Sequence, residues 1–208
     1  MIRTKRSLIR RTGAAIAAGA AVLVLAACGG NGDSPASDES RTTSPSADSS
    51  AAQEQHAAAD VAFAKGMIPH HRQAVEMADL ATSRAESAEV KKLAADVKKA
   101  QDPEIKTLSG WLTSWGEEVP AEGAMDHSMH GMEGMMSLDE MKQLEQASGK
   151  AFDTAFMEMM IKHHEGAVAM AKTEQAEGTY EPAKKMAGAI ITSQTAEITQ
   201  MKKLLGQG

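Results

Sequence analysis

The segment MIPHHRQAVEMA, residues 67–78, recurs as MIKHHEGAVAMA at residues 160–171. Both copies place two adjacent histidines after one methionine and before another. The match runs without a gap, at an offset of 93 residues, from Asp60 and Asp153 to Ile105 and Ile198. A repeat of this length indicates one structural unit that the chain uses twice.

Each copy is predicted to form two antiparallel helices. Apolar residues recur at steps of three and four, and no strand-like alternation is present. The helices should break at TSRAES (82–87) and at EGTYEP (177–182), where Gly178 suits a helix end and Pro182 the first turn of the next helix. Pro103 is expected to kink or interrupt its helix. The sequence therefore predicts an all-α four-helix bundle made of two repeated helical hairpins.

The hairpins are expected at 56–115 and 151–206, joined by a Met/His-rich linker at 116–150. In this linker Ser137 and Glu140 fit a capping box that opens a short helix ending at Gly149. A further part of the linker gathers methionine and histidine, which indicates an auxiliary metal-capture segment. Its candidate ligands are Met125, His127, Met129, His130, Met132, Met135 and Met136.

The N-terminus has the layout of a lipoprotein signal peptide. Five basic residues precede an apolar run that ends in LAAC, with Cys28, the chain's single cysteine, as the predicted lipidation site. Residues 29–55 are rich in Gly, Ser, Pro and Asp and are expected to be a disordered tether. We therefore expect an extracytoplasmic domain anchored to the membrane through lipid.

Charge excludes one class of partner. Removal of the signal lowers the Lys and Arg total from 22 to 17 against 28 Asp and Glu, so the net charge falls from −6 to about −11. A chain this acidic, without a basic patch, is not expected to bind nucleic acid. The sequence does not identify a protein partner.

The paired histidines are predicted to lie in a polar layer inside the bundle. Helical spacing puts His71 on one stripe with Met67 and Ala74, and the second copy repeats this stripe around His164. Antiparallel pairing brings polar side chains on the second helix of each hairpin level with the histidines. These expected partners, which should hold the histidines rather than bind metal, are Gln101, Glu104, Gln194 and Glu197.

Several interpretations of this layer stay open. A hydrogen-bonded core network could simply fix the helix register. A di-iron oxidase of the ferritin type would need Glu-x-x-His, which the chain lacks. An envelope interaction or sensor bundle would use the histidines structurally. The fourth interpretation is a soft-metal site, because thioether and imidazole without thiolate favour Cu(I) and Ag(I) over zinc, magnesium or calcium.

For the metal site, the spacing does not decide which histidine of each pair binds, and Cu(II) remains an alternative to Cu(I). Met67 and His71, like Met160 and His164, lie one helical turn apart, whereas His70 and Met77 are separated by two turns. The candidate ligands are Met67, His70, His71, Met77, Met160, His163, His164 and Met170.

The segments FAKGMIPHHRQAVEMA (63–78) and FDTAFMEMMIKHHEGAVAMA (152–171) resemble the duplicated signature of a secreted family called domain of unknown function 305. The resemblance covers residues 56–206. It implies a ferritin-like four-helix bundle and assigns the candidate-ligand role to the same eight residues. Similarity to periplasmic copper-binding members implies a role in copper tolerance. Pro69 and Arg72 replace Lys162 and Glu165 between copies, so the two sites need not be equivalent.

Taken together, the sequence predicts a Cu(I)-binding lipoprotein that buffers or sequesters copper and serves copper homeostasis in the cell envelope. It contains no Ser/His/Asp set, phosphate loop or cysteine nucleophile, so no enzymatic activity is expected. Asp60 and Asp153 are interpreted as helix-start or dipole residues rather than catalytic acids.

Overall fold

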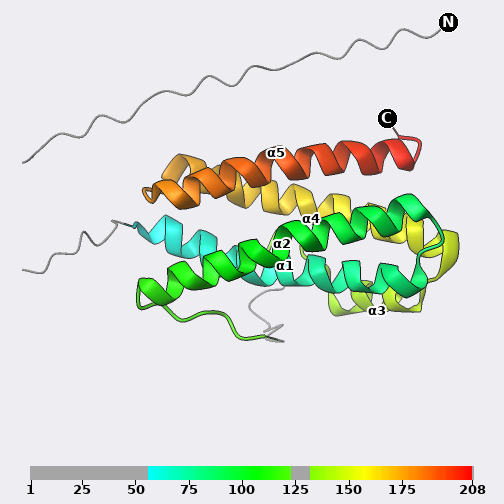
Figure 1. The fold of residues 1–208 in the computed structure, drawn as a ribbon, viewed down its shortest axis with the longest axis horizontal. Coiled ribbons are helices and arrows are strands. Elements are labelled where there is room, and N and C mark those ends of the chain that lie inside the picture. The colour runs from blue at the N-terminus through cyan, green and yellow to red at the C-terminus, as the bar shows by residue number, and fades with distance from the viewer. Residues whose placement is uncertain (1–55, 123–131, 208) are drawn as a thin grey trace, which may run out of the picture. The chain divides into compact units, whose positions relative to one another are not determined.

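The computed structural model of the chain describes residues 56–122 and 132–207, which belong to one compact unit. These residues form five helices and no strand (Figure 1): α1 (Ala58–Arg84), α2 (Ala88–Ser114), α3 (Leu138–Gln146), α4 (Gly149–Glu177) and α5 (Glu181–Leu204). Helices α1 and α2 form one hairpin, and α4 and α5 form the other. The predicted all-α bundle of two repeated hairpins is confirmed. The predicted signal, tether and Cys28 lie outside the described residues, as do Met125, His127, Met129 and His130.

Both hairpins turn at the predicted breaks. Helix α1 ends at Arg84, and α2 begins after Ser87, whose hydroxyl accepts a hydrogen bond from the Val90 N–H at 3.3 Å. Helix α4 ends at Glu177, and Pro182 lies in the first turn of α5, where its missing N–H costs nothing.

Helix α3 begins as predicted and ends earlier. The Ser137 hydroxyl accepts from the Glu140 N–H at 3.2 Å, and the Glu140 carboxylate accepts from the Ser137 N–H at 2.7 Å, which completes the capping box. The expected end at Gly149 was wrong, because α3 stops at Gln146 and Gly149 opens α4. Gly149 has a φ of +61°, a conformation that glycine adopts without strain. The second hairpin therefore begins at this residue.

Pro103 does not interrupt its helix. Helix α2 is continuous from Ala88 to Ser114, just as α1 continues through Pro69. A proline inside a helix removes one backbone hydrogen bond. Packing of the hairpins evidently outweighs that loss in both helices.

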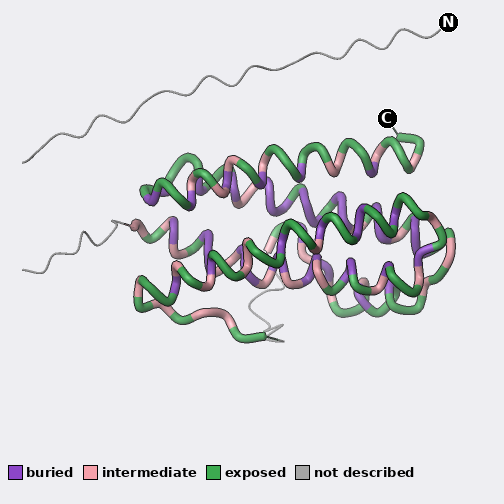
Figure 2. Tube along the Cα trace, viewed as in Figure 1, coloured by how far each residue is buried: buried purple, intermediate pink, exposed green. Residues whose placement is uncertain are grey.

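The apolar core consists of two clusters of buried side chains, one toward each end of the bundle. Buried residues lie on the inner faces of the helices (Figure 2). The cluster next to the α1–α2 turn includes Ala81, Val90, Leu93, Phe152, Phe156 and Met201. The cluster next to the α4–α5 turn includes Phe63, Leu108, Leu112, Tyr180, Ala183 and Ile190. The histidine pairs lie between these clusters along α1 and α4.

The two hairpins meet chiefly through α1 and α4. Ala74 and Ala167 occupy equivalent positions in the repeat, and both are fully buried. Each provides a small side chain on its helix. Helix α3 contacts the same two helices. No helix in the described ranges combines the length and the apolar character needed to cross a membrane.

Each hairpin has one aspartate that accepts hydrogen bonds from the turn of the other hairpin. The Asp60 carboxylate accepts from the N–H groups of Thr179 and Tyr180, at 3.1 and 3.0 Å. Asp153 accepts in the same way from the N–H groups of Glu86 and Ser87, at 3.1 and 2.8 Å. Both aspartates therefore satisfy backbone donors of the opposite hairpin.

Candidate metal centre

Four histidines converge at the contact between α1 and α4, and all four are fully buried. The rings of His70 and His163, one from each hairpin, lie with their centroids 3.7 Å apart at an angle of 42°. Because the repeat relates these residues, the pair lies where the two copies meet. The structure thus brings together histidines that are 93 positions apart in the sequence.

The other histidine of each pair contacts a glutamate within its own hairpin. His71 Nε2 lies 2.7 Å from Glu104 Oε2, and His164 Nε2 lies 2.6 Å from Glu197 Oε2. These contacts agree with the level that antiparallel pairing predicts. Both carboxylates are partly open to solvent, whereas both imidazoles are buried.

Six imidazole nitrogens of this layer lack a hydrogen-bond partner among the described residues. They are both ring nitrogens of His70 and His163 and the Nδ1 atoms of His71 and His164. Leaving a buried polar group unpaired costs about 1–3 kcal/mol. A purely structural hydrogen-bond network would not be expected to leave this many nitrogens unpaired.

Burial keeps the central histidines neutral. Burial, with a smaller contribution from the neighbouring His71 and His164, lowers the pKa of His70 to about 3. The Glu133 backbone beside the ring acts in the opposite direction and raises the pKa. Burial likewise holds the pKa of His163 well below its ordinary value, with His70 and His164 adding to the effect. Neutral imidazole has a nitrogen lone pair available, which is the form that binds metal ions.

The predicted methionine ligands lie on both sides of the histidine layer. Met77 and Met160 are buried in the cluster near the α1–α2 turn, together with Met136 of the linker. Met67 is buried in the other cluster, and partly buried Met170 packs against it. Thioethers therefore flank the histidines from both directions along the bundle.

Two glutamines predicted to lie level with the histidines are also buried. Gln101 and Gln194 are 2% and 3% exposed, and their side-chain oxygens lack partners among the described residues. Within residues 56–122 and 132–207, no three His, Cys, Asp or Glu side chains are arranged to hold a metal ion. A site with three or more ligands in this arrangement would therefore need thioether sulfur as well.

The sequence of residues 60–205 matches the family Domain of unknown function (DUF305). This match covers most of the chain and both copies of the repeat. The chain belongs to this family. No curated protein sequence matches it.

Solved DUF305 structures share the fold. A DUF305 protein of Streptomyces coelicolor, thought to be secreted, is 35% identical with a TM-score of 0.65, covering 72% of this chain and 91% of the other. CopM in its Cu(I)-bound form is 36% identical with a TM-score of 0.59, covering 70% and 94%. A DUF305 fragment from Deinococcus radiodurans is 27% identical with a TM-score of 0.65, covering 73% and 98%. CopM structures also include a Cu(II)-bound and an Ag-bound form.

Sequence reasoning about this DUF305 chain missed Gln73, Gly166 and Glu174. Gln73 and Gly166 occupy the same repeat position, and both contact the end of the linker. Glu174 is a buried acid where the first copy has Ala81. Comparison of the two copies could have found all three, because each is a change inside an otherwise matching buried face.

Proposed function

We propose that this protein binds Cu(I) outside the cytoplasm and buffers or sequesters it, with Ag(I) as a ligand of the same kind. The observation that carries this proposal is the buried layer of histidines. Six of its ring nitrogens lack partners in the part of the chain that the structure describes, and methionines lie on both sides. Copper is the cargo of the protein rather than a resident cofactor.

The unpaired nitrogens favour a ligand over a structural role for the layer. The contacts to Glu104 and Glu197 use one nitrogen of His71 and one of His164, which leaves each Nδ1 for a further partner. A carboxylate that holds the second nitrogen of a histidine is the usual arrangement around a metal ligand. Without a ligand, all four ring nitrogens of His70 and His163 would stay without a hydrogen-bond partner among the residues described.

The donor set favours a soft metal ion. Thioether and neutral imidazole suit Cu(I) and Ag(I), whereas hard cations need oxygen ligands. Met67 and His71 lie one turn apart, as do Met160 and His164, so one ion can contact both side chains of a pair. CopM, which shares this fold at 36–39% identity, has been solved with Cu(I), Cu(II) and Ag.

We further propose storage rather than catalysis, in a lipoprotein held at the membrane by Cys28. The LAAC segment and its preceding apolar run support this anchor, and the secreted assignment of the Streptomyces coelicolor relative supports an extracytoplasmic location. The linker residues from Met125 to Met136 would capture metal and pass it to the bundle. The partners are thus the metal ion and the lipid membrane.

The test is an anaerobic Cu(I) titration of the full-length protein, purified in mild detergent, against a chromogenic chelator. We expect tight binding that is lost when His70, His71, His163 and His164 are all changed to alanine. His56→Ala is the matched control, because His56 stacks on Trp115 at the end of the bundle and should leave binding intact.

Binding that persists in the fourfold histidine variant would contradict the bundle site. In that case deletion of residues 124–136 should abolish binding if the linker is the trap. Oxygen consumption with a loaded protein and repeated turnover would contradict storage and support an oxidase.

A further inference from the structure

Five linker residues just before α3, 132–136, lie across α1 and α4, and we call them the strap. The strap begins with a turn, in which the Met135 N–H donates to the Met132 carbonyl at 3.2 Å. It then leads directly into the capping box of α3. Gly134 and Met136 are buried, so the strap packs into the bundle surface rather than passing over it.

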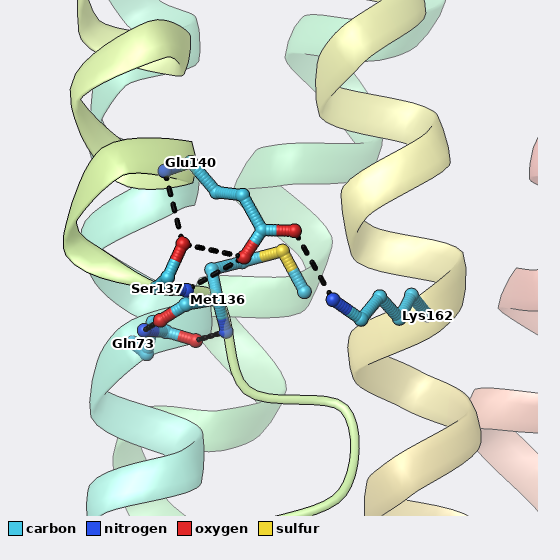
Figure 3. Close-up of polar contacts among 5 residues, drawn as sticks. All are labelled: Gln73, Met136, Ser137, Glu140 and Lys162. Carbon is cyan, nitrogen blue, oxygen red and sulfur yellow. Dashed lines mark hydrogen bonds and ion pairs between the residues drawn. The ribbon is translucent and has the colours of Figure 1, made fainter. Parts of the chain in front are cut away.

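Gln73 of α1 holds one end of the strap by two hydrogen bonds. Its amide nitrogen donates to the Met136 carbonyl at 2.9 Å, and its amide oxygen accepts from the Met136 N–H at 2.7 Å. Figure 3 shows this reciprocal pair beside Ser137, Glu140 and Lys162. The Gln73 side chain is only 2% exposed, so these bonds are shielded from water.

Gly166 of α4 makes room for the middle of the strap. A Cβ atom on Gly166 would overlap the carbonyl of Glu133. Gly134 approaches the same helix, with a φ of +84°, and a Cβ on it would lie 2.8 Å from the Lys162 carbonyl oxygen. Backbone thus packs directly on backbone at this point, which only glycine permits.

Gln73 and Gly166 are equivalent in the repeat, yet they serve the strap in different ways. One forms hydrogen bonds with it, and the other leaves space for it. A single strap cannot lie symmetrically on two identical helices, so the two copies must differ where it crosses them. Because this difference lies inside the repeated motif, each helix has its own residue that fits the strap where the strap crosses it.

The strap crosses next to the central histidine pair. The space that a Cβ on Gly134 would occupy lies 3.0 Å from the carbonyl oxygen of His163. At the start of the strap, Met132 Cε and Met170 Sδ lie 3.3 and 3.4 Å from the Cβ position of Gly66. The strap thus runs from half-buried Met132 past His163 to buried Met136, and both methionines are predicted linker ligands.

We propose that the strap controls access of metal ions to His70 and His163, and that Gln73 and Gly166 are positioning residues that hold it closed. This inference rests on the proposed function for its cargo, but the seating of the strap can be tested without metal. The strap closes the histidine layer in the metal-free protein. Metal reaches the ring nitrogens after the strap lifts from Gln73 and Gly166.

The first experiment measures modification of histidines by diethyl pyrocarbonate in the metal-free full-length protein, followed by peptide mass spectrometry. Gln73→Leu removes both hydrogen bonds at similar volume, and Gly166→Ala forces the strap away. We expect His70 and His163 to react about tenfold faster in Gln73→Leu, the factor expected when two hydrogen bonds no longer hold a closed state. Both histidines should also react faster in Gly166→Ala, because the added Cβ overlaps the Glu133 carbonyl. Reaction of His56 is the internal reference.

Two matched variants control for general effects of these substitutions. Gln200→Leu replaces an exposed glutamine of α5. Gly110→Ala adds a Cβ that would meet no described atom within 4 Å apart from its chain neighbours and the nearby backbone of its own helix. Neither should change the reactivity of His70 or His163. Thermal unfolding and circular dichroism of each variant separate release of the strap from loss of the fold.

The second experiment follows Ag(I) uptake by stopped flow, alongside the equilibrium affinity. Release of the strap should raise the uptake rate about tenfold and should raise the affinity or leave it unchanged, whereas a purely structural defect would lower the affinity. Unchanged reactivity of His70 and His163 in both folded variants would overturn the closed strap. Faster modification with unchanged Ag(I) uptake would overturn its control of metal access, and absence of Ag(I) binding by the wild type would instead refute the proposed function.

Discussion

At the scale of single residues, His71 and His164 show how the bundle prepares an imidazole for a ligand. Each is buried, and each has its Nε2 atom against a glutamate of the neighbouring helix. The remaining Nδ1 atom faces no partner among the described residues. The glutamate fixes the orientation of the ring, so its removal should weaken metal binding without removing a ligand.

Glu104→Gln tests this role. We expect the Cu(I) affinity to fall by about 10- to 100-fold, the range typical for partners of metal-binding histidines. The affinity is measured by chelator competition on the full-length protein. Asp102→Asn removes the same charge from an exposed position of the same helix and should leave the affinity unchanged. Equal losses in both variants would show that only charge matters.

Glu174 and Asp60 form an unusual buried acid pair. Burial and the adjacent Asp60 raise the pKa of Glu174 to about 8. Burial acts to raise the pKa of Asp60 too, but hydrogen bonds from Ala57, Tyr180 and Thr179 and the contact with Glu174 lower it to about 2. At neutral pH the pair therefore shares one negative charge, which stays on Asp60.

The raised pKa of Glu174 predicts a loss of stability as pH rises. Between its ordinary value of 4.5 and about 8, the folded state keeps a proton that the unfolded state releases, so the free energy of unfolding falls. The slope is at most about 1.4 kcal/mol per pH unit. Glu174→Gln should remove this slope in urea unfolding at pH 5 and pH 8, whereas Glu177→Gln, an exposed neighbour, should keep it. A wild-type protein equally stable at both pH values would refute the buried proton.

At the scale of elements, each hairpin is completed by an aspartate from the other. Asp153 accepts hydrogen bonds from two N–H groups before α2, and Asp60 does the same before α5. The repeat therefore exchanges contacts between copies, which explains why the aspartates are part of the duplicated pattern. The interpretation of Asp60 as a helix-start group is confirmed, because its carboxylate also accepts a hydrogen bond from the Ala57 N–H at the start of α1. It did not identify the contacts that both aspartates make with the opposite hairpin.

Asp153→Ala should lower the free energy of unfolding by about 1–3 kcal/mol, because two partly buried N–H groups lose a charged acceptor. The measurement is chemical denaturation of the full-length protein. Asp96→Ala removes an exposed carboxylate that pairs with Lys92, and its effect should stay within about 0.5 kcal/mol. An equally small effect of Asp153→Ala would mean that solvent replaces the aspartate at the turn.

The elements also show why sequence patterns located the helices better than their boundaries. Periodicity in the repeat fixed the four long helices, because every apolar stripe must face the core. Rules based on local sequence failed at positions where tertiary contacts determine the helix boundaries. Pro103 stays inside a helix that packing supports, and Gly149 opens a helix instead of ending one. Gly178 does end α4 as predicted, yet its φ is −69°. Glycine fits there because a Cβ would lie 2.7 Å from the Glu174 backbone carbonyl oxygen and would also meet the Glu174 carboxyl group.

At the scale of the whole molecule, the histidine layer was predictable and its closure was not. The paired motif predicted the histidines, and antiparallel pairing of the helices predicted the glutamates that contact His71 and His164. The meeting of His70 with His163 depends on how the hairpins dock, which no local pattern specifies. The seat of the strap depends on a contact between residues 63 positions apart, Gln73 and Met136, whose sequence signal is only one mismatch between the copies.

Because His70 and His163 come from different hairpins, a metal ion bound between them should stabilise the molecule as a whole. At an Ag(I) concentration 100-fold above the Kd, the gain is about 2.7 kcal/mol, or a rise in Tm of roughly 5–10 °C for a domain of this size. The measurement is calorimetry of the full-length protein with and without Ag(I).

His70→Ala alone should remove most of this rise, since one site would lose a ligand that both copies share. If each copy bound metal independently, the single substitution would leave about half of the Ag(I) bound. His56→Ala should keep the full shift, because that ring lies at the end of the bundle against Trp115.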